Sequence, residues 1–476
     1  MERSNTMLAE IKGLNEECGI FGIWGHKEAS LMTYYGLHSL QHRGQEGAGI
    51  VAKNGEGLKI YKSQGIVAEA FTKDILDDLS GNAAIGHVRY PTTGKTSDMV
   101  NIQPFLFHFE EASSVALCHN GNLTNTKSIR RELEGQGSIF QTSSDSEILV
   151  HLIKRNQLPT FADSVKQALS QVRGGFAYIL LTQNQMIAAR DPNGFKPLSI
   201  GELKDGGYCI ASETCAFDIV GAKFLRNVAP GEMIIIDDTG LKSQLYTKDT
   251  SLAICSMEYV YFARPDSDIE GTNVHTARKS MGKALAKAAP AFGDVVIGVP
   301  DSGISAAIGF SEESKIPYEI GLIKNRYIAR TFIKPTQELR EQGVKMKLSA
   351  VRGVVEGKRV VLIDDSIVRG TTSRRIVTLL RDAGASEVHV RVSSPLLKYP
   401  CFFGMNIQST KELIANKKSA EEICELIGAD SLEFMSVKSL TDTINLPYEG
   451  VHKGLCVACF NKCYCTSLFD YTSAIE

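Results

Sequence analysis

Two adjacent carboxylates, Asp364 and Asp365, follow a short apolar run in the second half of the sequence. The run at 360–363 is typical of a buried parallel strand, so the pair lies where that strand should end. Paired acids at this position suit the hydroxyls of a ribose, or a hard cation shared with a pyrophosphate. After three intervening residues come small, hydroxyl and basic side chains, at Arg369, Gly370, Thr371, Thr372 and Ser373.

The glycine and hydroxyl residues lead into a helical pattern at 373–383. Amide and hydroxyl groups at a helix start suit a phosphate ester, because that end of the helix carries partial positive charge. A lone acidic pair would indicate an ordinary α/β turn, whereas the whole run predicts a phosphate site. It resembles the signature of the phosphoribosyltransferases that use phosphoribosyl pyrophosphate (PRPP). The resemblance implies that Asp364 and Asp365 bind the ribose and its metal, and that residues 369–373 hold the 5-phosphate.

The first half carries polar residues at the ends of several expected strands and at one helix start. Cys18 begins an apolar strand, Arg89 ends another, Asn120 and Gly121 end a third, and Asp145 starts a helix. These residue types fit the hydrolysis of glutamine. A thiolate would attack the amide carbon, and the Asn120 amide with the Gly121 N–H could form an oxyanion hole. An arginine suits the carboxylate of an amino acid, and an acid suits its ammonium group.

A general base for this thiol is not evident, because none of the histidines at 42, 87 and 119 has an acidic partner nearby in sequence. If Cys18 became the chain terminus, its own α-amine could serve as the general base for the thiol, since such amines have a pKa of about 7.7–8.0. We therefore hypothesise that residues 1–17 form a propeptide that is removed autocatalytically after Glu17. Translation could begin at Met1 or Met7, with the same processed product.

The first half resembles the class II glutamine amidotransferases through the motifs CGIFG, HRGQEGAG, GHVRYPT, HNGN and SSDSE. That resemblance implies an N-terminal nucleophile fold, with two stacked sheets between helix layers. It also implies that Cys18 is the nucleophile and that Asn120 and Gly121 stabilise the oxyanion. Glutamine would be bound by Arg89, Thr92 and Asp145. Pro91 departs from the small residue that relatives often carry there.

Two further segments of the second half are expected to contact PRPP. The loop at 299–303 offers backbone amides and the Ser302 hydroxyl, which suit pyrophosphate or its metal. The stretch 321–348 is strongly basic, and it is either a solvated helix face or a mobile flap. We favour a flap that binds PRPP through Lys324 and Arg326, because the stretch lacks a clean apolar helical stripe. The expected Mg²⁺ site comprises Ser302, Asp364 and Asp365.

The chain has 11 cysteines, and the pair Cys456 and Cys459 has metal-ligand spacing. Cys255 and Cys401 could complete a four-thiolate site, which permits zinc or an iron–sulfur cluster. The arrangement resembles the cluster-bearing branch of the amidophosphoribosyltransferases, and this implies a structural [4Fe-4S] cluster. Cys463 and Cys465 are additional thiols whose roles the sequence leaves open.

Composition sets the broad class. A chain of 476 residues suggests two to three domains, and a net charge of -2 argues against a general nucleic-acid or membrane-surface role. The sequence contains no apolar run of about 20 residues and no secretory signal, so we expect a cytoplasmic protein. We expect an α+β half followed by an α/β half, divided as a propeptide (1–17), an amidotransferase domain (18–245), a type I phosphoribosyltransferase domain (255–450) and a cysteine-bearing tail (451–476).

Together the halves resemble the amidophosphoribosyltransferase family over residues 18–465. The resemblance implies transfer of the glutamine amide nitrogen to C1 of PRPP, giving 5-phosphoribosylamine, pyrophosphate and glutamate, in the first step of purine synthesis. It further implies a homotetramer and feedback inhibition by purine nucleotides. Two alternatives are a class II amidotransferase that aminates a sugar phosphate, and a PRPP-sensing regulator without catalysis. The PRPP signature disfavours the first, and the absence of an appended basic DNA-binding module disfavours the second.

Overall fold

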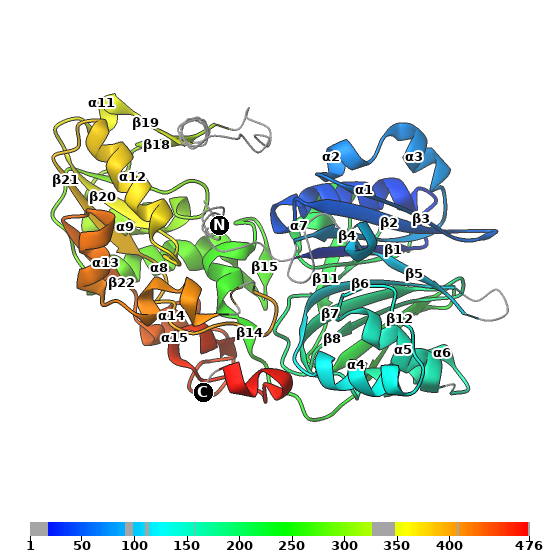
Figure 1. Ribbon diagram of the computed structural model, residues 1–476. Coiled ribbons are helices and arrows are strands. Elements are labelled where there is room, and N and C mark those ends of the chain that lie inside the picture. Colours follow the sequence, from blue (N-terminus) through cyan, green and yellow to red (C-terminus); the bar gives the residue numbers. More distant parts are fainter. Residues whose placement is uncertain are drawn as a thin grey trace, which may run out of the picture.

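The protein folds into two halves that lie side by side, with the N-terminal half in blue to green and the C-terminal half in green to red (Figure 1). This computed structural model describes residues 18–90, 99–109, 114–156, 158–325, 348–405, 407 and 409–474. The predicted propeptide, Thr92, Pro91 and Arg326 lie outside the described residues, as does most of the expected flap.

The N-terminal half contains two antiparallel sheets within the described residues. The first has the strand order β11 (Lys223–Asn227), β9 (Ser199–Glu202), β10 (Tyr208–Ala211), β1 (Gly19–Trp24), β4 (Ala83–Arg89), β2 (Gly47–Asn54) and β3 (Gly57–Gln64). The second has the order β13 (Gly240–Leu245), β12 (Glu232–Asp237), β8 (Met186–Arg190), β7 (Gly174–Leu181), β6 (Ser114–Leu123) and β5 (Phe105–His108). Apolar side chains from both sheets form one buried cluster, including Ile20, Ile85, Ile179 and Ile234, so the sheets pack face to face.

Helices cover the outer face of each sheet of this half (Figure 1). The first sheet carries α1 (Ala29–Ser39), α2 (Val67–Ala70), α3 (Lys73–Asp78) and α7 (Cys215–Val220), and the second carries α4 (Thr126–Gly135), α5 (Glu147–Asn156) and α6 (Phe161–Leu169). Close packing depends on Gly36 in α1, where a Cβ atom would lie 2.5 Å from the Phe21 ring. The predicted stack of two sheets between helix layers is confirmed.

The C-terminal half is built on a parallel sheet, as expected for an α/β domain. Its described strands run in the order β17 (Val295–Gly298), β20 (Arg359–Asp364), β21 (Glu387–Val392) and β22 (Ser431–Phe434). One face packs against α8 (Val274–Ala288), α9 (Ile304–Ser314) and α14 (Val437–Ile444), and the other against α12 (Thr371–Asp382) and α13 (Ala420–Ile427). Gly298 pairs with Ile363, so the loops that follow β17 and β20 leave the sheet at the same edge.

Short elements complete this half. A small antiparallel pair joins β18 (Leu322–Lys324) to β19 (Leu348–Ala350), and α11 (Arg352–Val355) follows it. The connection between the halves contains the single-turn π-helix η3 (Glu258–Phe262) and the pair β15 (Asp268–Ile269) and β16 (Thr272–Asn273). The 3-10 turns are η1 (Gln41–Arg43), η2 (Met99–Asn101), η4 (Thr410–Glu412), η5 (Ile414–Asn416) and η6 (Phe469–Ala474).

The C-terminal segment returns to the junction between the halves. Strand β23 (Leu455–Cys456) pairs in parallel with β14 (Ile254–Cys255), and α15 (Ala458–Asn461) follows. Further on, the Asp470 carboxylate accepts a hydrogen bond of 2.6 Å from the backbone N–H of Lys127, at the start of α4. The acidic group therefore binds the positive end of that helix and ties the chain's end to the N-terminal half. No helix among the described residues is long and apolar enough to cross a membrane.

Candidate functional site

The thiol of Cys18 lies at the start of β1, at an edge that this strand shares with the end of β4. Because Gly19 pairs with Val88, the next residues in each direction bring Cys18 and Arg89 to the same edge. The Cys18 thiol is buried and donates a hydrogen bond to the Tyr90 carbonyl at 3.5 Å. Pairing of β1 with β4 thus joins two residues that are far apart in the sequence.

The two candidate oxyanion donors, Asn120 and Gly121, lie inside β6 rather than at its end, where the sequence had placed them. The side-chain Nδ2 of Asn120 is buried and has no hydrogen-bond partner in the part of the chain that the structure describes. Gly121 has a φ of +141°, and a Cβ atom there would lie 2.1 Å from the Gly175 carbonyl oxygen, so only glycine fits. A buried donor without an acceptor is what an oxyanion hole offers to an incoming substrate.

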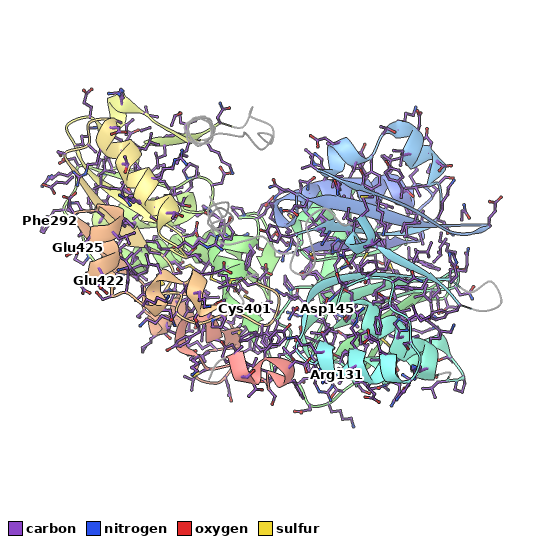
Figure 2. All side chains as sticks on the ribbon, viewed as in Figure 1. Arg131, Asp145, Phe292, Cys401, Glu422 and Glu425 are labelled. Atoms are coloured by element: carbon purple, nitrogen blue, oxygen red, sulfur yellow. The ribbon has the colours of Figure 1, made fainter. Side chains whose placement is uncertain are left out.

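Asp145 lies just before α5, and its carboxylate accepts a hydrogen bond of 2.9 Å from the Leu123 N–H at the end of β6. Figure 2 labels it on the side of the N-terminal half that faces the other half. The Asp145 Oδ1 atom lies 3.9 Å from Nδ1 of His119. Burial lowers the pKa of His119, which favours the neutral ring. Sequence reasoning missed this pair because its members are 26 residues apart and meet only through the fold.

Except for Asn120, which is buried beside it, these groups line one small cavity, formed by Cys18, Arg89, Tyr90, Asn101, Gln103, His119, Gly121, Ser144, Asp145 and Ser146. Its volume is about 20 Å³, enough for little more than a water molecule. Ser144 and Ser146 belong to the SSDSE motif and could have been singled out with Asp145, whereas Asn101 and Gln103 carried no signal in the sequence.

The second cavity lies at the edge where β17 and β20 end, and its volume is about 450 Å³. All the predicted PRPP and Mg²⁺ residues that the structure describes line it, namely Ser302, Lys324, Asp364, Asp365, Arg369, Gly370, Thr371, Thr372 and Ser373. Helix α12 begins at this cavity, two residues earlier than the sequence pattern had suggested, and Gly370 is its N-cap with a φ of +75°. The cavity can hold a sugar phosphate with its pyrophosphate.

The acidic pair in this cavity is almost fully buried. The Asp365 N–H donates to the Asp364 carboxylate at 2.9 Å, and the Ser302 hydroxyl donates to the Asp365 carboxylate. Burial raises the pKa of both acids, and the neighbouring carboxylate raises that of Asp364 further. A bound cation would offset this cost by stabilising the ionised forms.

The lining of the larger cavity includes side chains from both halves. His42, Arg43 and Gln45 come from the N-terminal half, and Arg264 and Arg278 come from the segment that follows β14. His42 and Arg43 are the first two residues of the HRGQEGAG motif, which the sequence had indicated only through the resemblance to the glutamine amidotransferases. The PRPP-type cavity is therefore completed by the amidase-type half.

Four of the cysteines meet at the junction of the halves. Pairing of β14 with β23 sets Cys255 opposite Cys456. The Cys459 carbonyl accepts hydrogen bonds of 3.0 Å from Lys398 and Tyr399, which hold the loop that leads to Cys401. Figure 2 labels Cys401 at the boundary between the halves. The segments that the sequence had grouped by residue type are thus neighbours in space.

The thiols at this junction lie in an apolar environment. Burial raises the pKa of Cys459, and a hydrogen bond to Cys465 together with burial raises that of Cys456. An all-thiol donor set fits zinc or an iron–sulfur cluster. Among the described residues, however, no three such side chains already stand in position to hold a metal ion together. The donors and their location fit a cluster, while the side chains need to reorient to bind one.

Comparisons with known proteins agree with this two-part architecture. The chain matches the glutamine amidotransferase domain family over residues 95–218 and the phosphoribosyl transferase domain family over residues 276–394. It is 59% identical over 466 residues to an amidophosphoribosyltransferase of Bacillus subtilis (strain 168), covering 98% of each chain. It is 54% identical over 460 residues to one of Staphylococcus aureus (strain Mu50), covering 96% of this chain and 93% of the relative.

Solved structures of similar proteins share the same two-part architecture. A glutamine PRPP amidotransferase of B. subtilis, complexed with ADP and GMP, superposes with a TM-score of 0.90 at 58% identity, over 95% of this chain and 98% of that one. A structure described as the allosteric regulatory enzyme of purine biosynthesis superposes with a TM-score of 0.92 at 57% identity, over 96% and 97% of the two chains. Both halves and their arrangement are therefore shared with these proteins.

Proposed function

The chain belongs to the amidophosphoribosyltransferase family, and on that premise we propose which of its residues carry each half of the reaction. The enzyme converts PRPP and glutamine to 5-phosphoribosylamine in purine biosynthesis. Glutamine and water give glutamate and ammonia, and ammonia then displaces pyrophosphate from C1 of PRPP. This is the function that the sequence had predicted.

We assign the first step to the small cavity. The Cys18 thiolate attacks the glutamine amide carbon, the C–N bond breaks and the protonated nitrogen leaves as ammonia, and water then hydrolyses the resulting thioester to glutamate and the free thiol. The Asn120 amide and the Gly121 N–H stabilise the oxyanion, which is supported by the buried and unpaired Nδ2 of Asn120. Arg89 and Asp145 bind the carboxylate and ammonium of glutamine, together with Thr92.

The base for this step is the α-amine of Cys18, freed by removal of residues 1–17. Neutral His119 lies beside Asp145, but its ring donates or accepts at Ser146 through Nδ1 at 2.8 Å rather than at the thiol. Nε2 of this ring has no hydrogen-bond partner among the described residues, and the proposal of a terminal amine rests on the resemblance to the class II amidotransferases. Mass spectrometry of the purified, active protein should show an N-terminal Cys, and full glutaminase activity from an unprocessed chain would refute this assignment.

We assign the second step to the larger cavity. Residues 369–373 bind the 5-phosphate at the start of α12, Asp364 and Asp365 bind the ribose hydroxyls, and Lys324 with Arg326 binds the pyrophosphate. Ser302, Asp364 and Asp365 are oxygen donors of the kind that Mg²⁺ prefers. When bound, Mg²⁺ would stabilise the charge of the leaving pyrophosphate. We propose that ammonia passes from the small cavity to the larger one, which side chains from both halves line.

We propose that Cys255, Cys401, Cys456 and Cys459 hold a structural [4Fe-4S] cluster, supported by their convergence on one apolar junction. The protein is proposed to be a cytoplasmic homotetramer. Its relative of known structure was complexed with ADP and GMP, and we propose that purine nucleotides likewise inhibit this chain. The domain limits at 18–245, 255–450 and 451–476 stand as proposals, with the tail docked against both halves.

The observation that carries these assignments is that every described PRPP residue lines one cavity, beside an amidase-type site on the other half. Cys18→Ala tests the division of labour. It should abolish phosphoribosylamine formation from glutamine and PRPP while leaving formation from ammonia and PRPP intact, since the second step needs only free ammonia. Pyrophosphate release measured with each nitrogen donor separates the two, and persistent glutamine-dependent turnover would contradict the assignment.

A further inference from the structure

A buried lysine lies beside β6, the strand that carries the two proposed oxyanion donors. The side chain of Lys196 is only 1% exposed and is among the largest fully buried side chains of the described residues. It belongs to the loop between β8 and β9, and it is not one of the residues that line the glutamine cavity. Burying an ammonium group is costly unless its surroundings stabilise the charge, so the position of this group needs a physical reason.

The loop that carries Lys196 is fastened to the sheet next to Gly121. The Asp191 carboxylate accepts hydrogen bonds from the backbone N–H groups of Phe176, at 3.1 Å, and Phe195, at 3.0 Å. Phe176 lies in β7, directly opposite Gly121 in β6. Because Phe195 immediately precedes Lys196, this carboxylate fixes the backbone of the lysine relative to the strand that carries the oxyanion donors.

The ammonium group of Lys196 reaches the same part of β6. A Cβ atom added at Gly404 would lie 2.5 Å from Nζ of Lys196 and 3.2 Å from the Cα atom of Gly121. Gly404 therefore lies against both groups, and it has a φ of +134°. The absence of a side chain at position 404 lets the ammonium approach Gly121 closely.

The charge of Lys196 also acts inside the glutamine cavity. His119 lines that cavity and precedes Asn120 in β6. Burial has the largest effect on the pKa of His119 and lowers it, the Asp145 carboxylate raises it, and the positive charge of Lys196 lowers it again. A cation that disfavours a second positive charge in this cavity favours a negative one there, because the same electrostatic field acts on both.

We propose that Lys196 is a positioning residue for glutamine hydrolysis, which acts through Gly121 and stabilises the oxyanion from outside the cavity. This inference rests on the proposed function, in which the Gly121 N–H and the Asn120 amide face the developing negative charge. The lysine adds a full positive charge near these donors. Because the charge is held in place before the substrate arrives, it costs no reorganisation when the oxyanion forms.

Two substitutions separate the charge of Lys196 from its shape in the processed, full-length protein. Lys196→Met keeps an unbranched side chain and removes the charge, whereas Lys196→Arg keeps the charge and adds bulk. With saturating PRPP, kcat for glutamate release should fall about tenfold or more in Lys196→Met and less in Lys196→Arg, with little change in the KM for glutamine. If the side chain only fills space, the order of the two variants should reverse, because buried sites tolerate added bulk poorly.

Alkylation of Cys18 by iodoacetamide shows whether the glutamine cavity is intact in Lys196→Met. This reaction places no negative charge on an amide oxygen, so its rate should stay within about twofold of the parent rate while kcat falls. Mass spectrometry of the Cys18 peptide measures the rate. An alkylation rate that falls as far as kcat would overturn the inference, because the lysine would then act on the thiol or on the shape of the cavity.

Gly404→Ala gives an independent variant if Lys196→Met does not fold. Its Cβ atom would displace the flexible end of Lys196 without removing the charge. Gly240→Ala is the matched control, because Gly240 also has a positive φ, +112°, but has open space around it. The kcat for glutamate release should fall about threefold or more in Gly404→Ala relative to Gly240→Ala, since Coulomb energy decreases with distance.

Formation of phosphoribosylamine from ammonia and PRPP is the reference for every variant and should keep the parent rate. A kcat for glutamine within about twofold of the parent in Lys196→Met, or in Gly404→Ala in its place, would overturn the inference alone. Equal losses in the glutamine and ammonia reactions would also overturn it. A parent protein that releases no glutamate from glutamine would overturn the proposed function itself.

Discussion

At the scale of single residues, the amidase-type site is built around a donor that the protein itself leaves unsatisfied. The Nδ2 atom of Asn120 is buried without a partner among the described residues, although such a group costs about 1–3 kcal/mol. In the proposed function the substrate is the acceptor, because the negative charge that develops on the amide oxygen would meet a donor already in place. The cost is thus recovered in the transition state rather than in the resting enzyme.

Asn120→Ala should therefore lower kcat for glutamine-dependent turnover by about 10²–10³-fold, the usual effect of removing one oxyanion donor. The KM for glutamine should change little, because the donor acts mainly on the transition state. Steady-state assays with glutamine and with ammonia make the comparison. The ammonia-dependent reaction serves as the control and should be unaffected, whereas parallel losses in both reactions would indicate a general structural defect.

A second residue-scale prediction concerns pH. His87 in β4 is fully buried, and burial lowers its pKa to about 3 from 6.5. The unfolded chain then binds a proton below pH 6.5 while the folded chain does not. The stabilisation is complete above pH 6.5 and is lost as the pH falls, by about 2 kcal/mol between pH 7.5 and 5. Asp191 has a pKa raised to about 6 and acts in the opposite direction.

Comparison of the parent protein with His87→Gln isolates the contribution of this histidine to the pH dependence of the unfolding free energy, because Asp191 contributes equally in both proteins. The variant should lose about 2 kcal/mol less unfolding free energy than the parent on going from pH 7.5 to 5. Urea unfolding followed by fluorescence reports the N-terminal half, since Trp24 in β1 is the single tryptophan of the chain. Identical pH dependence in the two proteins would show that His87 does not titrate as described.

At the scale of elements, the proposed phosphate site is the start of α12, and its geometry depends on Gly370. This N-cap residue has a φ of +75°, and no side chain caps the helix there. The first turn therefore presents its amides to the cavity instead of to a capping hydroxyl or carboxylate. A Cβ atom at this position would also lie 3.0 Å from Cδ1 of Ile414.

Gly370→Ala should raise the KM for PRPP by about tenfold or more, because the first turn of α12 must shift to relieve the strained φ. Gly428→Ala is the matched control. Gly428 has the same φ of +75° at the end of α13, with open space around it and no contact with the cavity. Both variants should lose about 1 kcal/mol of stability, and only the first should bind PRPP poorly. Equal KM values in thermal-shift-matched samples would contradict the assignment.

The elements that sequence could predict are those whose signal is local. The strand before Asp364 and the helix after Gly370 are contiguous, so hydrophobic pattern and turn residues sufficed to place them. The same holds for Cys18 and Arg89 at strand ends. Asn120 was expected at the end of a strand but lies inside β6, because period-two patterns do not define where a strand stops.

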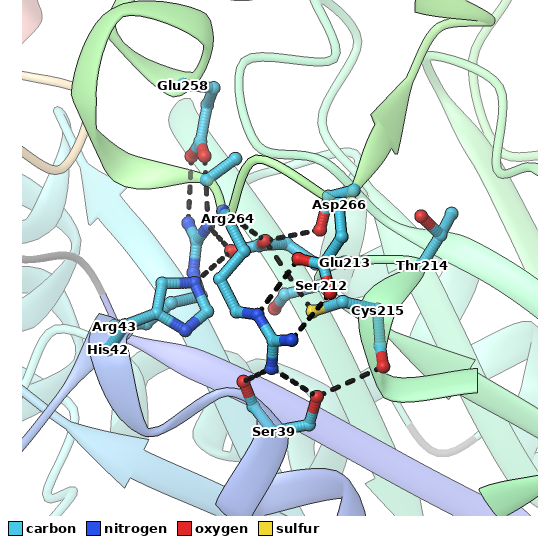
Figure 3. A network of polar contacts seen from close by, with 12 residues as sticks. Ser39, His42, Arg43, Ser212, Glu213, Thr214, Cys215, Glu258, Arg264 and Asp266 are labelled. Atoms are coloured by element: carbon cyan, nitrogen blue, oxygen red, sulfur yellow. Dashed lines mark hydrogen bonds and ion pairs between the residues drawn. The ribbon is translucent and has the colours of Figure 1, made fainter. Parts of the chain in front are cut away.

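What the sequence could not predict depends on contacts between distant segments. The contribution of His42 and Arg43 to the PRPP cavity arises only when the two halves dock. The hydrogen bonds between Arg43 and Glu258, which join the two halves (Figure 3), span 215 positions and have no periodicity or motif of their own. Likewise, His119 was set aside for want of an acidic neighbour, and the fold supplies Asp145.

At the scale of the whole molecule, the junction is held by segments from both halves. The loop after Cys401 packs on the amidase-type half, where Asn122 donates to the Phe402 carbonyl at 2.8 Å. The ring of Phe403 stacks on that of Phe195 at 4.2 Å. A cluster that fixed Cys401 would thereby brace β6, the strand that carries both proposed oxyanion donors.

Cys401→Ser tests the proposed cluster and its structural role together. Anaerobically purified parent protein should contain about four iron and four sulfide ions per chain, and the variant should contain almost none. Because the cluster joins segments that are distant in sequence, its loss should lower the melting temperature by about 5–10 °C. Glutamine-dependent turnover should fall more than PRPP affinity, since the loop braces the amidase-type strand.

Cys463→Ser is the control: its thiol is exposed and bonds to the Asn461 carbonyl, so iron content and stability should match the parent. Bound zinc without iron would reject the cluster, and full iron in Cys401→Ser would reject Cys401 as its ligand.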